Sequence, residues 1–234
     1  MDKKVTLFTK HKMSPRYNVA LTDSTWFSSD LLPINFDKMY DCKKQLKLFS
    51  TLERNQFCCF SKRQLVNAHD LHPSLPPTAS FYSLNVIPHW NTCNMKNWEE
   101  MEVRVRNLVR KANHDMIIYT GQEFDDTFSP NINLHNGLVG YQTVPQYLWK
   151  VVQDPLSAAS LAIIQVNVPD LSPADTSDYV LCRDICHLTE WMQSNNWDNV
   201  EDGFLYCCNV TQFEEIFNKT FSPKMKHILM DVQV

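Results

Sequence analysis

The sequence predicts an α+β fold, with an antiparallel or mixed sheet flanked by helices, in a single domain spanning residues 1–234. Three observations support this prediction. The chain contains short apolar runs of strand length and two stretches whose apolar residues recur at helical spacing, and it lacks the strict alternation of strand and helix that indicates a parallel sheet. With 44% hydrophobic residues, a chain of 234 residues is long enough to bury one sizeable core.

The central segment combines a strand with a helix. The Pro-rich sequence HPSLPP precedes an apolar strand expected over residues 81–87, which Pro88 is expected to end. Over residues 97–113, apolar side chains recur three and four positions apart, so an amphipathic helix is predicted. Its apolar face comprises Trp98, Met101, Val105, Leu108 and Ala112, and its polar face carries Glu102, Arg104, Arg106, Arg110 and Lys111.

The C-terminal half adds two strands and two helices to the prediction. The sequence MIIYTG, at residues 116–121, predicts a strand that Gly121 stops, and LAIIQVN, at residues 161–167, predicts a buried strand. A second amphipathic helix is expected over residues 179–193, and a short final helix over residues 212–218.

The cysteines and the N-terminal sequence indicate in which cellular compartment the protein is expected. The first residues include no apolar run of signal-peptide length, and no segment reaches the roughly 18 apolar residues of a membrane span. We therefore expect an intracellular chain, cytoplasmic or nuclear, without membrane association, whose eight cysteines are mostly thiols. Cys182 and Cys186 are of zinc-ligand type, but no second pair completes a set of four ligands. The glycosylation sequons at Asn209 and Asn218 have meaning only for a chain in the secretory route.

The overall charge restricts how nucleic acid would bind. A formal net charge of -4 and a pI near 6.0 exclude a surface coated in basic residues. Any contact with DNA or RNA must therefore come from a local groove.

One segment has a specific resemblance. The sequence FYSLNVIPHWNTCNMKNWEEMEVRVRNL, at residues 81–108, resembles the core of the DNA/RNA non-specific endonuclease family, the ββα-metal nucleases. In that family a strand ending in Phe-Tyr-x-x-Asn-x-x-Pro leads to an Asn and then to a Trp and Glu-x-x-x-Arg on a helix. The similarity extends over about residues 14–220 and includes a Val-Pro-x-x-x-Trp-Lys segment at residues 144–150.

The resemblance implies a metal-dependent phosphodiesterase site. Family members bind one Mg²⁺ through an Asn side chain with water as further ligands, which suits a cation that dehydrates reluctantly, and Asn94 occupies that position. Glu102 is then expected to order a metal-bound water, and Arg106 to stabilise charge developing on the phosphate. The residues alone leave a plainer interpretation open, in which Asn94 is a turn residue and Glu102 and Arg106 form a surface ion pair. Homologous nucleases are often dimers, so a homodimer is one expected state.

The catalytic motif itself is altered. Family members carry Asp-Arg-Gly-His-Leu before an Ala-Asp pair, and the sequence SKRQLVNAHDL aligns with that motif without a gap. Gln64 then stands where the general-base histidine is expected, and an amide does not accept a proton near neutral pH. Ser61 replaces Asp, Lys62 replaces the phosphate-contacting Arg, and Arg63 replaces Gly, so a bulky cation stands where close approach is needed.

Three functional hypotheses follow. The leading one is a nuclease-like protein with little or no nuclease activity that retains Mg²⁺ or nucleic-acid binding, with Lys62, Arg63 and Arg106 as contacts to DNA or RNA. The first alternative is an active Mg²⁺-dependent endonuclease in which His89 or His69 replaces the general base, with His72 a more remote candidate. The second is an adaptor that uses the nuclease scaffold to bind an unidentified protein partner.

Overall fold

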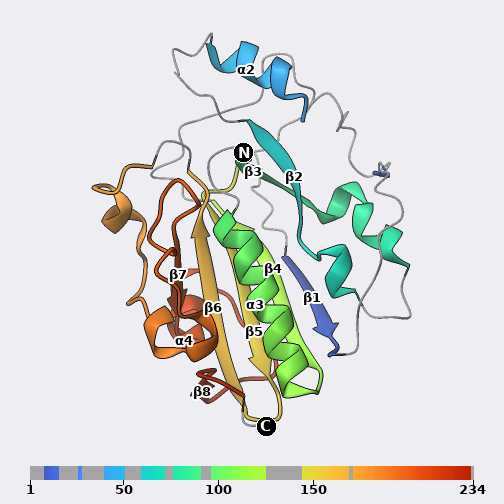
Figure 1. Ribbon diagram of the computed structural model, residues 1–234, viewed down its shortest axis with the longest axis vertical. Coiled ribbons are helices and arrows are strands. Elements are labelled where there is room, and N and C mark those ends of the chain that lie inside the picture. Colours follow the sequence, from blue (N-terminus) through green and yellow to red (C-terminus); the bar gives the residue numbers. More distant parts are fainter. Residues whose placement is uncertain are drawn as a thin grey trace.

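A mixed sheet forms the centre of the protein in a computed structural model that describes residues 8–15, 26–27, 40–50, 59–71, 76–90, 96–124, 144–168 and 171–232. Five strands pair in the order β1-β4-β5-β6-β7, and β8 pairs in parallel with β6 (Figure 1). The strands are β1 (Phe8–Met13), β4 (Met116–Glu123), β5 (Tyr147–Asp154), β6 (Ala159–Val166), β7 (Leu205–Cys208) and β8 (His227–Ile228). The predicted α+β class is confirmed.

Helices cover both faces of this sheet. The helix α3 (Lys96–Ala112) runs across one face, where Met101 and Val105 share an apolar cluster with Leu148 and Val152 of β5 (Figure 1). On the other face, Phe213 of α4 (Val210–Ile216) packs with Trp149 and Val151. Every residue of β5 and β6 is therefore buried, which explains why these strands are continuous apolar runs rather than alternating ones.

A two-stranded antiparallel sheet precedes α3. Its strands are β2 (Phe60–Gln64) and β3 (Val86–Trp90), and the order β2-β3-α3 is the ββα unit that the sequence predicts. The strand expected over residues 81–87 is wrong in its bounds, because two short 3₁₀ helices, η2 (Pro77–Phe81) and η3 (Ser83–Asn85), take up most of that segment. Pro88 lies inside β3 opposite Lys62, and a proline fits there because β3 has a strand partner along one edge in this sheet.

Gly121 does not stop its strand. The strand β4 continues through Gly121 to Glu123, and Gly121 pairs with both Phe8 and Trp149. A Cβ at position 121 would lie within 2.7 Å of the Trp149 ring and of the Phe8 Cβ. The glycine therefore makes room for an aromatic side chain on the neighbouring strand, which is a packing role that resembles a stop signal in sequence.

The predicted helix over residues 179–193 is wrong. The segment instead forms the 3₁₀ helices η4 (Thr176–Tyr179), η5 (Cys186–Leu188) and η6 (Glu190–Met192), with irregular residues between them. Disulfides fix this segment to β7: Cys182 bonds to Cys208, and Cys186 bonds to Cys207. Because the two bridges attach to adjacent residues of one strand, the segment follows β7 instead of winding into a helix.

The remaining predicted elements are confirmed with small shifts. The helix predicted over residues 97–113 is α3, and the strand predicted over residues 161–167 is β6. The last helix, predicted over residues 212–218, begins earlier because Asn209 caps it: its Oδ1 accepts a hydrogen bond from Thr211 N at 2.8 Å. The described part of the chain also contains α2 (Cys42–Ser50), and none of its helices is long and apolar enough to span a membrane.

Candidate active site

The candidate site lies where the β2–β3 pair and α3 meet the sheet, and Glu102 is at its centre. The Glu102 side chain is 2% exposed. Its Oε1 accepts a hydrogen bond from Trp98 Nε1 at 3.1 Å, and its Oε2 accepts one from Asn67 Nδ2 at 3.0 Å. Arg63 NH2 lies 3.3 Å from Oε2, and Lys150 Nζ lies 3.8 Å from Oε1. Glu102 was predicted on the polar outer face of the helix, and that placement is wrong: the carboxylate points inward to a ring of donors.

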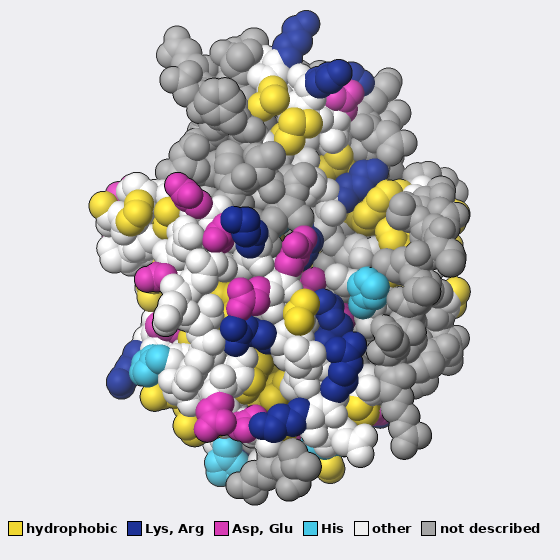
Figure 2. Space-filling view, viewed as in Figure 1, with side chains coloured by type: hydrophobic (Ala, Val, Ile, Leu, Met, Phe, Trp, Pro, Cys, Tyr) yellow, Lys and Arg dark blue, Asp and Glu magenta, His cyan; other side chains and the backbone are white. Residues whose placement is uncertain are grey.

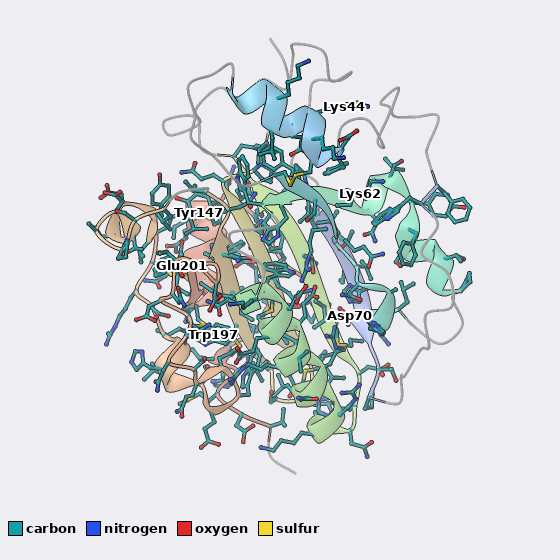
Figure 3. The ribbon with its side chains drawn as sticks, turned by 45° about the horizontal axis from the view of Figure 1, so that its top comes forward. Lys44, Lys62, Asp70, Tyr147, Trp197 and Glu201 are labelled. Atoms are coloured by element: carbon teal, nitrogen blue, oxygen red, sulfur yellow. A yellow bond between two sulfur atoms is a disulfide. The ribbon has the colours of Figure 1, made fainter. Side chains whose placement is uncertain are left out.

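A second carboxylate completes the arrangement. Arg106 NH1 donates to Asp70 Oδ1 at 3.0 Å, and the Asp70 side chain is 1% exposed. Asp70 belongs to the 3₁₀ helix η1 (Ala68–Asp70) that follows β2, and Figure 3 shows it next to α3. Lys150, which is fully buried on β5, donates to Thr120 Oγ1 at 3.0 Å. We refer to Arg63, Asp70, Glu102, Arg106 and Lys150 as the charged cluster.

The two carboxylates of the charged cluster differ in their pKa shifts. Burial disfavours the charged form of Glu102, but the nearby cations Arg63, Lys150 and Arg106 outweigh it and lower the pKa of that carboxyl. At Asp70 burial prevails, and with the added repulsion of Glu102 it raises the pKa despite Lys150 and Arg106. Glu102 is therefore the more firmly ionised of the two, held by three cations in a dry environment.

Arg63 is the cation whose position most affects the space around Glu102. Its guanidinium reaches Glu102 Oε2 at 3.3 Å and Glu99 Oε1 at 3.2 Å, and its side chain is 11% exposed. Because side chains alternate along a strand, Arg63 leaves β2 on the face opposite Lys62 and Gln64. The residue that stands in place of the family's glycine thus fills the space in front of the glutamate.

Gln64 has a structural role at the position of the general base. Its Nε2 donates to Ser80 O at 3.2 Å and to Ser80 Oγ at 3.0 Å, and its Oε1 accepts from Ala68 N at 3.2 Å. Both ends of the amide therefore connect β2 to the turns that follow it. Lys62, labelled in Figure 3, lies on the same strand face. Its ammonium lies 5.2 Å from the centre of the Trp26 ring, an arrangement of cation–π type.

The histidines proposed as replacement bases lie in contrasting environments. His89, on β3, is fully buried, and its Nε2 lies 3.2 Å from Gln165 Oε1. Burial, assisted by the charge of Arg63, lowers the pKa of His89 to about 3. His69 is exposed and lies in η1, five residues beyond Gln64, the last residue of β2. His72 lies outside the described residues.

The described part of the site includes Glu102, the residue expected to order a metal-bound water. Asn94, the predicted Mg²⁺ ligand, lies outside the described residues. The oxygens of Glu102 already accept from Trp98 and Asn67 and face two cations, Arg63 and Lys150. A carboxylate so surrounded does not fit the role of holding a metal-bound water, because such a water would have to displace a guanidinium.

Three residues of the site were missed by the sequence analysis, although signals for two of them were present. Asp70 aligns with the acidic residue of the family's Ala-Asp pair, and Lys150 ends the Val-Pro-x-x-x-Trp-Lys segment. Neither was assigned a role, because a charged residue in an alignment does not reveal that its side chain is buried. Asn67 carries no signal: its contact with Glu102 depends on the turn after β2.

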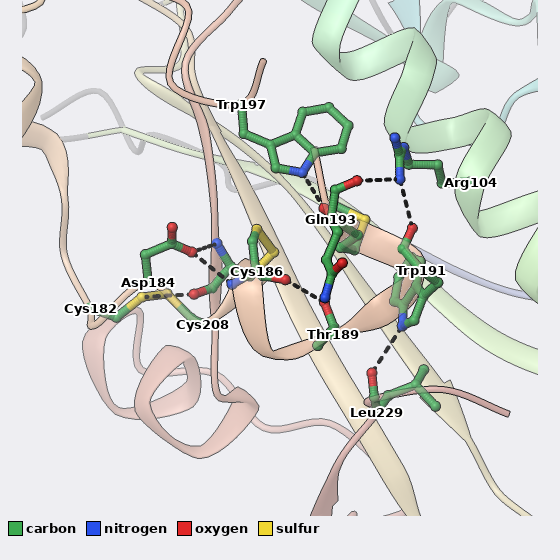
Figure 4. The surroundings of a disulfide bond; sticks show 12 residues. Arg104, Cys182, Asp184, Cys186, Thr189, Trp191, Gln193, Trp197, Cys208 and Leu229 are labelled. Carbon is green, nitrogen blue, oxygen red and sulfur yellow. Dashed lines mark hydrogen bonds between the residues drawn. A yellow bond between two sulfur atoms is a disulfide. The ribbon is translucent and has the colours of Figure 1, made fainter. Parts of the chain in front are cut away.

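A separate hollow lies near the disulfides. A pocket of about 500 Å³ is bordered by Asp184, Cys186, His187, Trp197 and Phe204, among others. Asp184 Oδ1 accepts from Cys186 N at 2.9 Å and from Cys207 N at 3.0 Å (Figure 4). The Asp184 carboxylate lies close to the sulfurs of Cys186 and Cys207, as ligands do in a metal site. These two sulfurs are bonded to each other in a disulfide, so they are not available as metal ligands.

The cysteines correct the prediction of free thiols. The described residues contain disulfides between Cys42 and Cys59, Cys182 and Cys208, and Cys186 and Cys207. Cys207 and Cys208, which are adjacent on β7, face opposite sides of the sheet. Cys58 and Cys93 lie outside the described residues.

A ββα unit beside a mixed sheet, with Trp98, Glu102 and Arg106 at successive four-residue intervals on α3, defines a protein of the ββα nuclease class. The chain belongs to the DNA/RNA non-specific endonuclease family, whose sequence profile matches residues 1–213. Proteins of this family are generally metal-dependent and act on DNA or RNA.

Two relatives that the chain resembles are salivary proteins. The chain is 22% identical over 254 residues to a salivary endonuclease of Lutzomyia longipalpis, a match that covers 94% of this chain and 60% of that protein. It is 32% identical over 158 residues to the salivary protein Tsal2A of Glossina morsitans morsitans, a match that covers 66% of this chain and 39% of that protein. The chain thus spans only part of the length of either relative.

Proposed function

We propose that the protein is a nuclease-fold protein with a degenerate active site and little or no nuclease activity. The observation that carries this proposal is the position of Arg63, whose guanidinium lies against Glu102 where an active site needs room for water and phosphate. Gln64 supports it, because an amide stands at the general-base position and its hydrogen bonds connect β2 to the following turns. A lost general base alone lowers the rate about 10²- to 10⁴-fold.

Digestion of nucleic acid tests this proposal directly. Supercoiled plasmid and structured RNA are incubated with the purified chain in Mg²⁺ or Mn²⁺, with EDTA controls and with Glu102→Gln prepared in parallel. We expect cleavage at background level that does not differ between the unmodified chain and the variant. Robust metal-dependent cleavage that disappears in His89→Ala would instead establish the replacement-base alternative, in which the buried imidazole must first become accessible.

Nucleic-acid binding without cleavage is a second candidate function, favoured by an aromatic surface next to β2. The rings of Phe27 and Tyr82 stack with centroids 5.4 Å apart, and they are 41% and 49% exposed. Lys62 lies beside the adjoining Trp26, so a cation and exposed rings occur together, as in sites where single-stranded bases stack. Elsewhere, on the face bearing α3, acidic and basic groups are interspersed (Figure 2).

Binding is measured with fluorescent single-stranded DNA and RNA over a series of salt concentrations. We expect affinity that falls as salt rises, because phosphate contacts release counterions. Tyr82→Ala should weaken binding by removing a stacking ring, whereas Leu84→Ala, a change at a nearby residue that is 43% exposed, should have little effect. Equal affinity of the two variants would argue against the aromatic surface.

The compartment proposed for the chain is an oxidising one, in place of the intracellular location expected at first. Disulfides persist along the secretory route and are rare in reducing compartments, and the described residues contain three. The salivary relatives support the same proposal. Labelling of thiols in the native protein before and after reduction tests it: the six bridged cysteines should react only after reduction.

A further inference from the structure

The C-terminal part of the chain contains two sequons that the candidate site leaves unexplained. Asn209-Val210-Thr211 and Asn218-Lys219-Thr220 both match the Asn-x-Thr pattern that receives N-linked glycans in the secretory route. The sequence alone does not show which of the two sequons carries a glycan. The structure distinguishes them, because their environments differ in exposure and in the use of the asparagine side chain.

Asn218 lies in a turn that is anchored on both sides yet presents its own side chain to solvent. Phe217 packs against the apolar cluster below α4, and Phe221 is 2% exposed. Lys219 is held between them: its Nζ lies 2.5 Å from Glu123 Oε1, and its side chain is 13% exposed. Asn218 and Thr220 alternate with these anchors and are exposed.

The backbone at Asn218 also suits this residue type. Its φ is 48°, in the left-handed region that asparagine occupies more readily than most residues. The turn therefore has a conformation that directs Asn218 outward, away from the packed Phe217 and Phe221.

Asn209 is already part of the fold. It is half-buried between Cys208, the last residue of β7, and the buried Val210. Its Oδ1 caps α4 by accepting from Thr211 N, which is a residue of the same sequon. An oligosaccharide on this side chain would have to leave the junction between β7 and α4, where Cys208 is cross-linked to Cys182.

We propose that Asn218 is an N-glycosylation site and that Asn209 is not. In the transfer, Asn218 Nδ2 forms a bond with the anomeric carbon of a lipid-linked oligosaccharide. The bond from that carbon to the lipid pyrophosphate breaks, the pyrophosphate leaves with its electron pair, and the amide proton is released. The inference rests on the proposed oxidising compartment.

The position of Asn218 leaves the candidate active site open. Asn218 follows α4, which packs on the sheet face that includes Trp149 and Val151. The charged cluster belongs to the opposite face, because Lys150 and Trp149 are adjacent in β5 and point to opposite sides. A glycan at Asn218 would therefore extend from the α4 face without covering Glu102.

The test expresses the full chain behind an added secretory leader in insect cells. Secreted protein is digested with N-glycosidase in heavy-oxygen water, so that each glycosylated Asn becomes a labelled Asp in peptide mass spectra. We expect the label at Asn218 in most molecules and none at Asn209. Thr220→Ala should abolish the label, Thr220→Ser should retain it, and Asn209→Gln should leave it unchanged.

The outcomes that oppose the inference are distinct. Secreted protein with intact disulfides and an unmodified Asn218 refutes the glycosylation site but leaves the proposed compartment standing. A glycan at Asn209 alone refutes the choice between the two sequons. Secreted protein in which the bridged cysteines are all free thiols refutes the oxidising compartment and, with it, the basis of the inference.

Discussion

The charged cluster and the segment that is disulfide-bonded to β7 are stabilised by different kinds of interaction. In the charged cluster, three basic and two acidic side chains from β2, η1, α3 and β5 contact one another in a dry interior. Residues 171–204 contain only 3₁₀ turns and depend on two disulfides to β7. Removing one charge from the first region should leave buried counter-charges unpaired, whereas the second region should be destabilised mainly by loss of its bridges. The comparison indicates that residues of the candidate active site also contribute to the stability of the fold.

The largest expected effect comes from restoring the family's motif in β2. The fourfold variant Ser61→Asp, Lys62→Arg, Arg63→Gly, Gln64→His frees Glu102 from the guanidinium and supplies an imidazole at the general-base position. We expect metal-dependent plasmid cleavage at least about 100-fold above that of the unmodified chain, the lower end of the usual contribution of a general base.

Two controls accompany this variant. Gln64→His alone should restore little, because the Arg63 guanidinium still contacts Glu102. Adding Asn94→Ala to the fourfold variant should abolish the gain if Asn94 binds the metal as the family resemblance implies. Cleavage that persists without Asn94 would show that the recovered activity does not use the family's metal position.

Arg63 contacts two carboxylates, the buried Glu102 and the exposed Glu99, and removing each of them should have a different effect on stability. Glu102→Ala leaves Arg63 and Lys150 without their buried counter-charge and should lower the free energy of unfolding by about 3–5 kcal/mol. Glu99, whose side chain is 56% exposed, contacts the same guanidinium, and Glu99→Ala should cost less than about 1 kcal/mol. Urea unfolding of both variants measures the difference, and similar losses would mean that the charged cluster is solvated.

The disulfide region gives the third prediction. Replacing both Cys186 and Cys207 with Ala removes a bridge between residues 21 positions apart, which should lower the free energy of unfolding by about 3 kcal/mol. The comparison is made in urea under oxidising conditions, and full reduction of the unmodified chain, which opens the other bridges as well, should cause a larger loss. A variant as stable as its parent would mean that the contacts of Asp184 with the two backbone amides suffice.

What the sequence predicts well in this protein are the features set by local pattern. The helix α3 follows from apolar spacing, and β6 from a long apolar run bounded by polar residues. The stretch 179–193 has the same helical spacing as α3, yet it forms 3₁₀ turns because cross-links to β7 override local preference. Disulfide formation depends on the approach of distant strands, which spacing along the chain does not encode.

The site was predictable in its residue types but not in its state. Glu102, Arg106 and the altered motif were found from sequence, since each is set by position in a pattern. The inward orientation of Glu102 was not, because it depends on Lys150, which lies 48 positions further along the chain and faces it from the sheet. The spacing of residues along one helix therefore predicts which of its faces is polar. It does not show that a buried cation on another strand can hold a carboxylate in the interior.

The smallest predicted effect concerns His89 and the pH dependence of stability. The unfolded chain takes up a proton on this residue near pH 6.5, whereas burial keeps the folded imidazole neutral down to a pKa of about 3. Between these values the unfolded state binds more protons, so stability is retained above pH 6.5 and falls as the pH decreases. The contribution of His89 between pH 7 and pH 5 should be a loss of about 2 kcal/mol.

His89→Gln removes this proton uptake and should make the free energy of unfolding less dependent on pH by that amount. Urea unfolding of both proteins at pH 7, 6 and 5 gives the difference, which cancels the contribution of His11, a residue whose pKa is also lowered to about 3. The lowered pKa of Glu102 acts only below about pH 4.3 and so does not enter this window. Parallel pH curves would mean that His89 is protonated in the folded protein near neutrality, which is the state that a replacement base requires.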